Sequence, residues 1–96
     1  MSALLERIGR LDSKLNVFIR LDGDAAMDAA RAAEAEITSG RLRGPLHGVP
    51  VGIKDIIDVA GLPTTCHSKV LIDNLAAADA VCVSCRRNRA RQALYP

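Results

Sequence analysis

Large apolar side chains are scarce in this sequence of 96 residues, which limits the core that it can build. Phe18 and Tyr95 are the only aromatic residues, and tryptophan is absent. Fifteen of the hydrophobic residues are alanines, which bury little area each. Because a domain of this length buries only about 60–65% of its unfolded surface, we expect marginal stability and apolar faces that need a partner surface.

Long hydrophobic runs and an even set of cysteines are also missing. No apolar run approaches the roughly 20 residues of a membrane span, and charges interrupt the N-terminal segment, so we expect neither a membrane anchor nor a signal peptide. The cysteines, Cys66, Cys82 and Cys85, form an odd set that is typical of reduced thiols rather than of a disulfide framework. These absences predict a cytoplasmic protein with no membrane partner.

The net charge of +2 hides an uneven distribution of charge along the chain. All eleven acidic residues lie within residues 1–79, whereas the last part of the chain has no acid and contains Arg86, Arg87, Arg89 and Arg91. Basic clusters can bind nucleic-acid phosphates, but this one lacks interleaved aromatics for base stacking and any recognised motif. We therefore expect no nucleic-acid partner, and we expect residues 85–96 to be a divergent, disordered basic tail.

Hydrophobic spacing predicts two N-terminal helices with a short strand between them. The first helix is predicted to be capped by Ser2, and residues 16–21 alternate in polarity, which favours a strand. The second helix is rich in alanine, begins at Asp22 or Asp24 and stops before Gly40. The first helix carries one apolar stripe, made of Leu4, Leu5, Ile8, Leu11 and Leu15.

The second half of the chain alternates loops with short apolar segments. Residues 40–50 form a loop rich in glycine and proline, and residues 49–53 then predict a short strand that ends at Lys54. Asp79 is the predicted cap of a third helix, whose apolar periodicity fails after Ser84. Helices and short strands together indicate an α/β fold. The uncovered edge of the strand at 49–53 predicts self-association with a second copy of the chain.

Lys54 is the residue with the most direct chemical interpretation. A lysine at a strand end, followed by an aspartate, is ordinarily a solvated or paired surface charge. If apolar strands desolvate such a lysine, its pKa falls, and the neutral amine can activate a serine without a histidine. The physics of the residue alone leaves both interpretations open.

The residues around Lys54 carry a resemblance that favours the catalytic interpretation. The string GPLHGVPVGIKDIIDVAGLPTT, residues 44–65, closely resembles the amidase signature family around its catalytic lysine. The likeness covers residues 4–84, with LNVFIRLD before the Ala-rich helix and AADA after the motif, in the same order as in the family. We therefore interpret residues 1–84 as the N-terminal part of an amidase signature domain. The resemblance implies an α/β fold in which these helices and short strands form part of an incomplete mixed sheet.

The same resemblance implies a chemistry and a substrate class. In the family a Ser-cisSer-Lys triad hydrolyses or transfers carboxamides, so a small amide is the expected substrate and Lys54 the expected catalytic residue. The lysine relays a proton through the cis-serine to and from the nucleophilic serine, and no cofactor is expected. Neither serine, nor the oxyanion hole, can be placed in this sequence. We therefore expect a truncated amidase-family protein that is inactive alone.

Three further interpretations concern a partner, a metal and the origin of the tail. A non-enzymatic binding module would use the Ala-rich helix or the basic tail to engage a partner. Cys66, His67, Cys82 and Cys85 are zinc-type ligands, but they include only one close cysteine pair, so we expect no metal site. His67 also stands where the family commonly has glycine or alanine, and a bulky side chain there can distort a tight turn. The loss of pattern after Ser84 is what a frameshift or a mis-called gene end produces.

Overall fold

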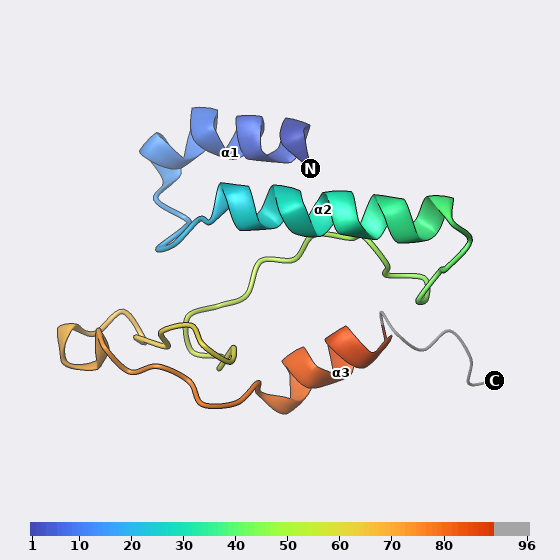
Figure 1. Ribbon diagram of the computed structural model, residues 1–96. Helices are drawn as coiled ribbons and strands as arrows, with labels where there is room; N and C mark the ends of the chain where they lie inside the picture. Colours follow the sequence, from blue (N-terminus) through green and yellow to red (C-terminus); the bar gives the residue numbers. More distant parts are fainter. Residues whose placement is uncertain (90–96) are drawn as a thin grey trace. The chain divides into compact units, whose positions relative to one another are not determined.

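The computed structural model describes the backbone of residues 1–89 and the side chains of residues 1–87. The chain divides into two compact units, of which the first comprises Met1–Arg41 and the second begins at Leu42. Figure 1 shows the order of the elements: two α-helices, a long irregular segment that contains one 3-10 turn, and a third helix. The candidate catalytic lysine lies in the irregular segment of the second unit.

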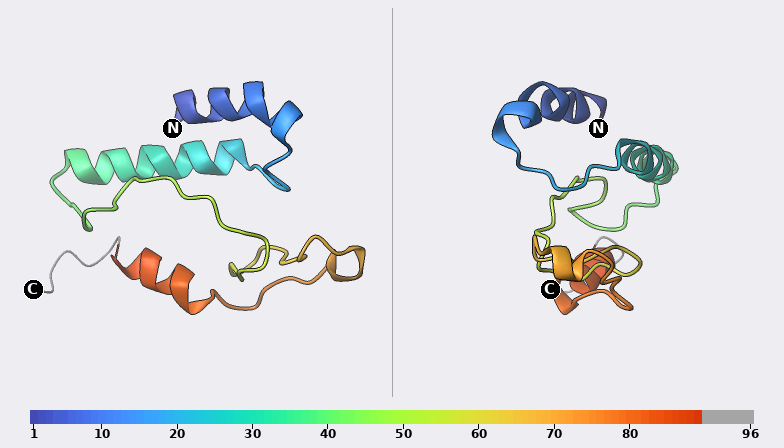
Figure 2. Two further views of the ribbon diagram at one scale, coloured as in Figure 1. Left: turned by 180° about the vertical axis from the view of Figure 1, so that it is seen from behind. Right: turned by 90° about the vertical axis from the view of Figure 1, so that its left-hand side faces the viewer.

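The first unit is a helical hairpin. Helix α1 spans Ser2–Leu15 and helix α2 spans Gly23–Thr38, and the two lie side by side and antiparallel in the views of Figures 1 and 2. A Cβ atom placed on Gly23 would lie 3.8 Å from a methyl carbon of Leu5, so α2 begins against the flank of α1. Neither helix contains a buried residue. The hairpin therefore leaves most of its apolar side chains in contact with solvent.

Local side-chain chemistry sets the ends of these helices. Asp22 caps α2, because its carboxylate accepts a hydrogen bond of 3.0 Å from the N–H of Ala25, and this confirms one of the two predicted caps. Gly40 has a φ of 79° and stops the helix as predicted. The cap predicted at Ser2 is wrong: Met1 occupies the cap position, and no side chain satisfies the first N–H groups of α1.

The strand predicted at residues 16–21 is not formed. Asn16 takes a left-handed φ of 49° and donates its N–H to the carbonyl of Asp12 at 2.7 Å, which ends α1. The Asp12 carboxylate then accepts hydrogen bonds from the N–H groups of Val17 at 2.8 Å and Phe18 at 3.2 Å. Backbone groups that a strand would offer to a neighbour are used locally, and they turn the chain between the helices.

The second unit consists mainly of turns. A 3-10 turn, η1, spans Lys69–Leu71, and helix α3 spans Val81–Arg89. Within residues 1–89 the single β-bridge joins Pro63 to Leu75 in the antiparallel sense. Residues 49–53, the other predicted strand, have no ladder partner among the described residues, and a strand exists only when a neighbouring segment pairs with it. The helices of the predicted α/β fold are confirmed, whereas its short strands are not seen in this part of the chain.

Helix α3 begins one residue later than predicted and without the predicted cap. The carboxylate of Asp79 accepts a hydrogen bond from the N–H of Ala60 at 2.8 Å and pairs with Arg87 at 2.8 Å. The first carbonyl of the helix is that of Ala80, which accepts from the N–H of Ser84 at 3.0 Å. Asp79 therefore ties the irregular segment to the side of α3 and does not cap its first turn.

The helix also extends past the point where its sequence pattern fails. Residues 85–89 are helical, although they belong to the predicted tail, and residues 90–96 lie outside the described part of the chain. Val83 of this helix, at 6% exposed, and Ala76 are the buried hydrophobic residues in the described region. The core of the second unit is thus very small. Within residues 1–89, none of the helices combines the length and the apolar character that crossing a bilayer requires.

Candidate active site

Asp55, the residue after Lys54, is the anchor of the candidate site. Its carboxylate accepts hydrogen bonds from the N–H of Thr65 at 2.8 Å and the N–H of His67 at 3.2 Å, and also from the Thr65 hydroxyl. Its backbone carbonyl accepts from the N–H of Cys66 at 2.9 Å. These bonds fasten the segment that carries the lysine to a turn that begins ten residues downstream of Asp55.

Three backbone N–H groups of the turn at residues 65–68 bond to Asp55, those of Thr65, Cys66 and His67. Cys66 and His67 both have left-handed backbone angles, with φ of 51° and 55°. The turn is closed by a hydrogen bond of 2.8 Å from the N–H of Ser68 to the carbonyl of Thr65. The Asp55 carboxylate accepts two of these bonds, from Thr65 and His67, so the turn already holds an anion from its own chain.

This arrangement lowers the pKa of Asp55 below its ordinary value of 3.8. The main cause is the hydrogen bond from the Thr65 hydroxyl, followed by the bond from the Thr65 backbone N–H. Partial burial raises the pKa, while the N–H and the charge of His67 lower it. Asp55 is therefore a charged acceptor near neutral pH, and its position suits it to hold the turn in place.

A second set of backbone bonds supports the turn. The N–H of Gly61 donates to the carbonyl of Ala76 at 2.9 Å, and the N–H of Ala76 donates to the carbonyl of Leu62 at 3.1 Å. Thr64 and Asn74 are joined twice, by a backbone bond of 2.9 Å and by the Asn74 side-chain amide, which donates to the Thr64 carbonyl at 2.9 Å. Thr64 is only 5% exposed, so these bonds are protected from water. The pairing gives the otherwise irregular unit a fixed frame.

Lys54 itself lies at the surface of this frame. Its side chain is exposed, and it forms no ion pair or hydrogen bond with the described residues. Its carbonyl accepts from the N–H of Ile57 at 3.0 Å, which makes a turn directly after the motif. The neighbouring Ile53 and Ile56 are 44% and 58% exposed. The apolar surroundings that the catalytic interpretation requires are therefore not assembled within residues 1–89.

The other residues considered as ligands do not come together. Cys66 lies in the turn at 65–68, whereas Cys82 and Cys85 lie on α3, and all are free and exposed. No group of three or more histidine, cysteine or acidic side chains in the described region is placed to hold a metal ion. His67 instead contributes its backbone N–H to Asp55, at a left-handed position where glycine would be unstrained.

The hydrogen bonds between Asp55 and Thr65 were not predicted from the sequence. The available signal was the position of an aspartate directly after the motif lysine and a Thr-Thr pair at the start of a polar turn. Aspartate and threonine side chains often bond to nearby backbone, and such bonding favours turns over strands. That signal alone does not say which turn the aspartate reaches, because the Asp55–Thr65 bond spans ten residues.

Comparison with known proteins agrees with the motif. The family model described as Amidase matches residues 1–90. The chain is 49% identical over 80 residues to the A subunit of glutamyl-tRNA(Gln) amidotransferase from Aromatoleum aromaticum, a match that covers 83% of this chain and 16% of that protein. It is 42% identical over 81 residues to the protein of the same name from Acidothermus cellulolyticus, with 84% and 16% covered. The corresponding protein of Gloeobacter violaceus is 48% identical over 67 residues, with 70% and 14% covered.

The matches cover a small part of each relative but nearly all of this chain. The chain spans about 16% of the length of the first two relatives, so it corresponds to a small part of each. The family match continues to residue 90, past the position at which the sequence pattern fails, and it therefore includes the whole of α3. Because the match covers nearly all of the sequence, the chain belongs to the amidase family.

Proposed function

We propose that this chain is the catalytic-lysine segment of an amidase-family enzyme, with Lys54 as the base that exchanges protons with the family's serines. The observation that carries this proposal is the local geometry of the motif. Asp55 is bound firmly to the turn at 65–68, while the adjacent lysine side chain is exposed and has no partner among the described residues. A lysine on a fixed backbone, with a free amine, is suited to meet a serine supplied by another segment.

The substrate in this proposal is a carboxamide whose C–N bond is hydrolysed or transferred. The relatives are amidotransferase subunits by name, and this favours transfer of the amide nitrogen over simple hydrolysis. Lysine catalysis of this type needs the neutral amine, which takes the proton of a serine hydroxyl and later returns it to the leaving nitrogen. Free thiols on the surface agree with a cytoplasmic location for the protein.

We further propose that residues 1–96 are inactive by themselves. A base contributes to amide cleavage only when a nucleophile and an oxyanion hole are close to it. All serines of the chain lie in the described region, and none of them is hydrogen-bonded to Lys54. Ser39 donates its hydroxyl to the carbonyl of Glu36 at 2.9 Å, and the Ser68 hydroxyl accepts from the N–H of Val70 at 3.3 Å, so these two serve local turns.

A graft tests the proposed role of Lys54. Residues 1–84 would replace the matching segment of the Aromatoleum aromaticum protein, and release of ammonia from a carboxamide would be measured. The grafted protein should be active, and Lys54→Ala should lower its rate by about 10²–10⁴-fold, the usual contribution of a general base. Lys69→Ala, which removes another exposed lysine of the same unit, is the matched control and should leave the rate unchanged. Full activity of the Lys54→Ala graft would refute the role.

A further inference from the structure

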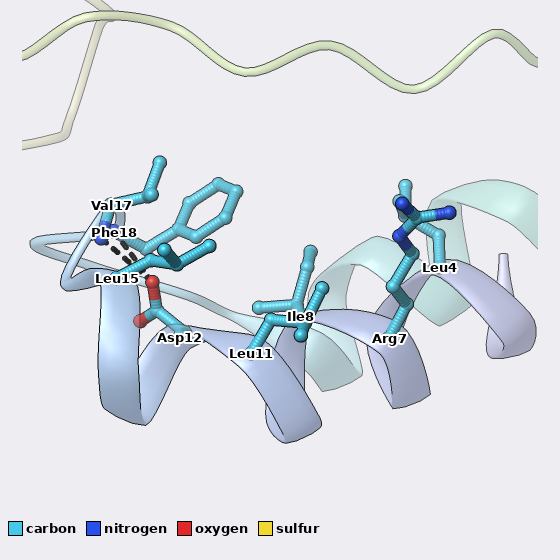
Figure 3. Close-up of a pocket in the computed structure, with 8 residues that line it drawn as sticks. All are labelled: Leu4, Arg7, Ile8, Leu11, Asp12, Leu15, Val17 and Phe18. Atoms are coloured by element: carbon cyan, nitrogen blue, oxygen red, sulfur yellow. Dashed lines mark hydrogen bonds between the residues drawn. The ribbon is translucent and has the colours of Figure 1, made fainter.

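An apolar groove runs along α1 and shares no residue with the Lys54 segment. Its volume is about 150 Å³, and Figure 3 shows side chains of the helix and of the following turn around it. Leu4 and Leu11 are 39% and 38% exposed, and Leu15 is 62% exposed. The apolar lining consists of Leu4, Ile8, Leu11, Leu15, Val17 and Phe18.

The spacing along the helix is that of a coiled-coil seam. Leu4, Ile8, Leu11 and Leu15 are separated by four, three and four residues, which places leucine, isoleucine, leucine and leucine at successive d, a, d and a positions. A β-branched residue at a with leucine at d favours two parallel strands. No residue of α2 lines the groove, and Leu5, which a Cβ atom on Gly23 would approach to 3.8 Å, lies on the flank of the stripe.

The charges beside the seam distinguish a parallel pair from an antiparallel one. At 3.6 residues per turn, Arg7 and Asp12 lie on opposite flanks of the stripe, each about 70° from its centre. Arg7 occupies a g position, and Asp12 occupies the e position five residues later. In a parallel pair of helices, the g residue of one copy meets this e residue of the other. In an antiparallel pair Arg7 would instead meet Lys14 of the second copy, since both lie on the same flank.

Arg7 and Asp12 are both able to form an ion pair with a second copy of the chain. Asp12 uses Oδ1 to accept from Val17 and Phe18, while its Oδ2 has no hydrogen bond within the described residues. Arg7 is exposed and has no ion pair in this part of the chain. Figure 3 shows the Arg7 side chain standing at one end of the groove, away from Asp12 of its own helix.

We propose that this face of α1 binds a second copy of the chain in parallel, with Arg7 of each copy paired with Asp12 of the other. This face shares no residue with the Lys54 segment, and the proposal does not depend on the proposed function. The seam contains only about two heptads, and helices of this length are marginal in water, so the dimer should be weak and form at high protein concentration.

The test is sedimentation equilibrium of the 96-residue chain from micromolar to millimolar concentration, at low salt. The natural chain should dimerise, and Arg7→Glu should raise the dissociation constant about tenfold, because two attractive pairs become repulsive. Asp12→Lys should do the same. A mixture of the two variants should regain the natural affinity, since each repulsive contact is replaced by an attractive one in the mixed pair.

Arg10→Glu is the matched control, because it makes the same charge change on the same helix away from the stripe. Asp12→Lys also removes the hydrogen bonds to Val17 and Phe18, so circular dichroism should check that α1 still forms in this variant. The Arg7→Glu result does not depend on that check. A chain that stays monomeric at millimolar concentration overturns the proposal. Equal affinities for the natural chain and Arg7→Glu overturn it as well, and that result would point to the edge at residues 49–53 instead.

Discussion

His67 occupies a backbone position that suits glycine. Its φ of 55° lies in the left-handed region, where a side chain costs roughly 1–2 kcal/mol. Cys66, directly before it, has the same conformation. The strain persists because both N–H groups bond to Asp55. A glycine at this position would remove the strain, whereas an alanine would keep it, and the imidazole of His67 is tolerated because it lies at an exposed site.

We therefore expect His67→Gly to stabilise the turn by up to about 1 kcal/mol. Relief of the left-handed strain is partly offset by the larger conformational freedom of glycine in the unfolded chain, which costs about 0.5–1 kcal/mol. Hydrogen exchange of the Thr65 and Cys66 amides measures the change locally. His67→Ala is the control, because it removes the ring and keeps the strain. Equal protection in the glycine and alanine variants would contradict this explanation.

The charge of Asp55 makes the turn sensitive to acid. Its pKa is lower in the folded state than the ordinary 3.8, so its stabilising contribution is complete above pH 3.8 and is lost as the pH falls through the folded-state pKa. The Thr65 amide resonance should follow this loss, with a midpoint below 3.8. Asp55→Asn should remove the pH step and loosen the turn at every pH. Asp58→Asn, at an exposed aspartate nearby, should keep the step, and a natural midpoint above 3.8 would argue against the described bonds.

At the level of single residues, the sequence identifies Lys54 through its motif, but it does not reveal that Asp55 holds the lysine segment in place. The motif around the lysine is read directly along the chain, and the family match agrees with it. The role of Asp55 depends on the left-handed turn at 65–68, which contains none of the glycine or asparagine that usually announces such a conformation. Whether Lys54 is catalytic stays a prediction.

Among the elements, the sequence predicted the local cap at Asp22 correctly and the local cap at Ser2 wrongly, and it did not indicate the longer links. Asp22 bonds to Ala25, three residues on, and the sequence indicates such a cap directly. Asp79 lies two residues before α3, and its carboxylate bonds to Ala60, which is nineteen residues away. The strand predicted at 49–53 is not seen in the described residues, and its ladder partner is likewise not a local property of the sequence.

The two bonds of Asp79 should contribute unequally to α3. Asp79→Ala removes both the acceptor of the Ala60 N–H and the ion pair, and because hydrogen bonds to charged groups are among the stronger ones, we expect a loss of about 1–3 kcal/mol. Arg87→Ala removes only the pair, whose arginine side chain is 60% exposed, and should cost less than about 1 kcal/mol. Helical circular dichroism against urea concentration measures both. Equal losses would mean that the ion pair is the dominant contact.

For the whole molecule, the helices are specified by the sequence while the sheet of the predicted α/β fold is not seen in the described residues. Helix α2 shows this with its own cap, Asp22, and its own stop, Gly40. A core needs bulky residues packed from several elements, and this chain offers Ala76 and Val83 as its buried hydrophobic residues within residues 1–89. Family membership could be predicted because the GVPVGIKD string is specific, not because the fold could be assembled.

The isolated chain should therefore have a small free energy of unfolding. No large side chain in the described region is fully buried, so few residues contribute the roughly 1.5–3 kcal/mol that full burial supplies. Ordering the backbone opposes folding by about 1–2 kcal/mol per residue. Urea unfolding followed by circular dichroism should show a broad transition. Its midpoint should rise with protein concentration if α1 binds a second copy, and should not rise for Arg7→Glu.

The opposite result would change the functional assignment as well as the expected stability. A sharp transition, worth several kcal/mol and independent of concentration, would mean that the chain forms a stable domain from contacts other than those described. A segment that only supplies Lys54 to a larger amidase has no need of such independence. A binding module requires it, because its surface must keep one shape without a surrounding enzyme. That outcome would favour a partner-binding role through α2 or the basic tail over the catalytic-lysine proposal.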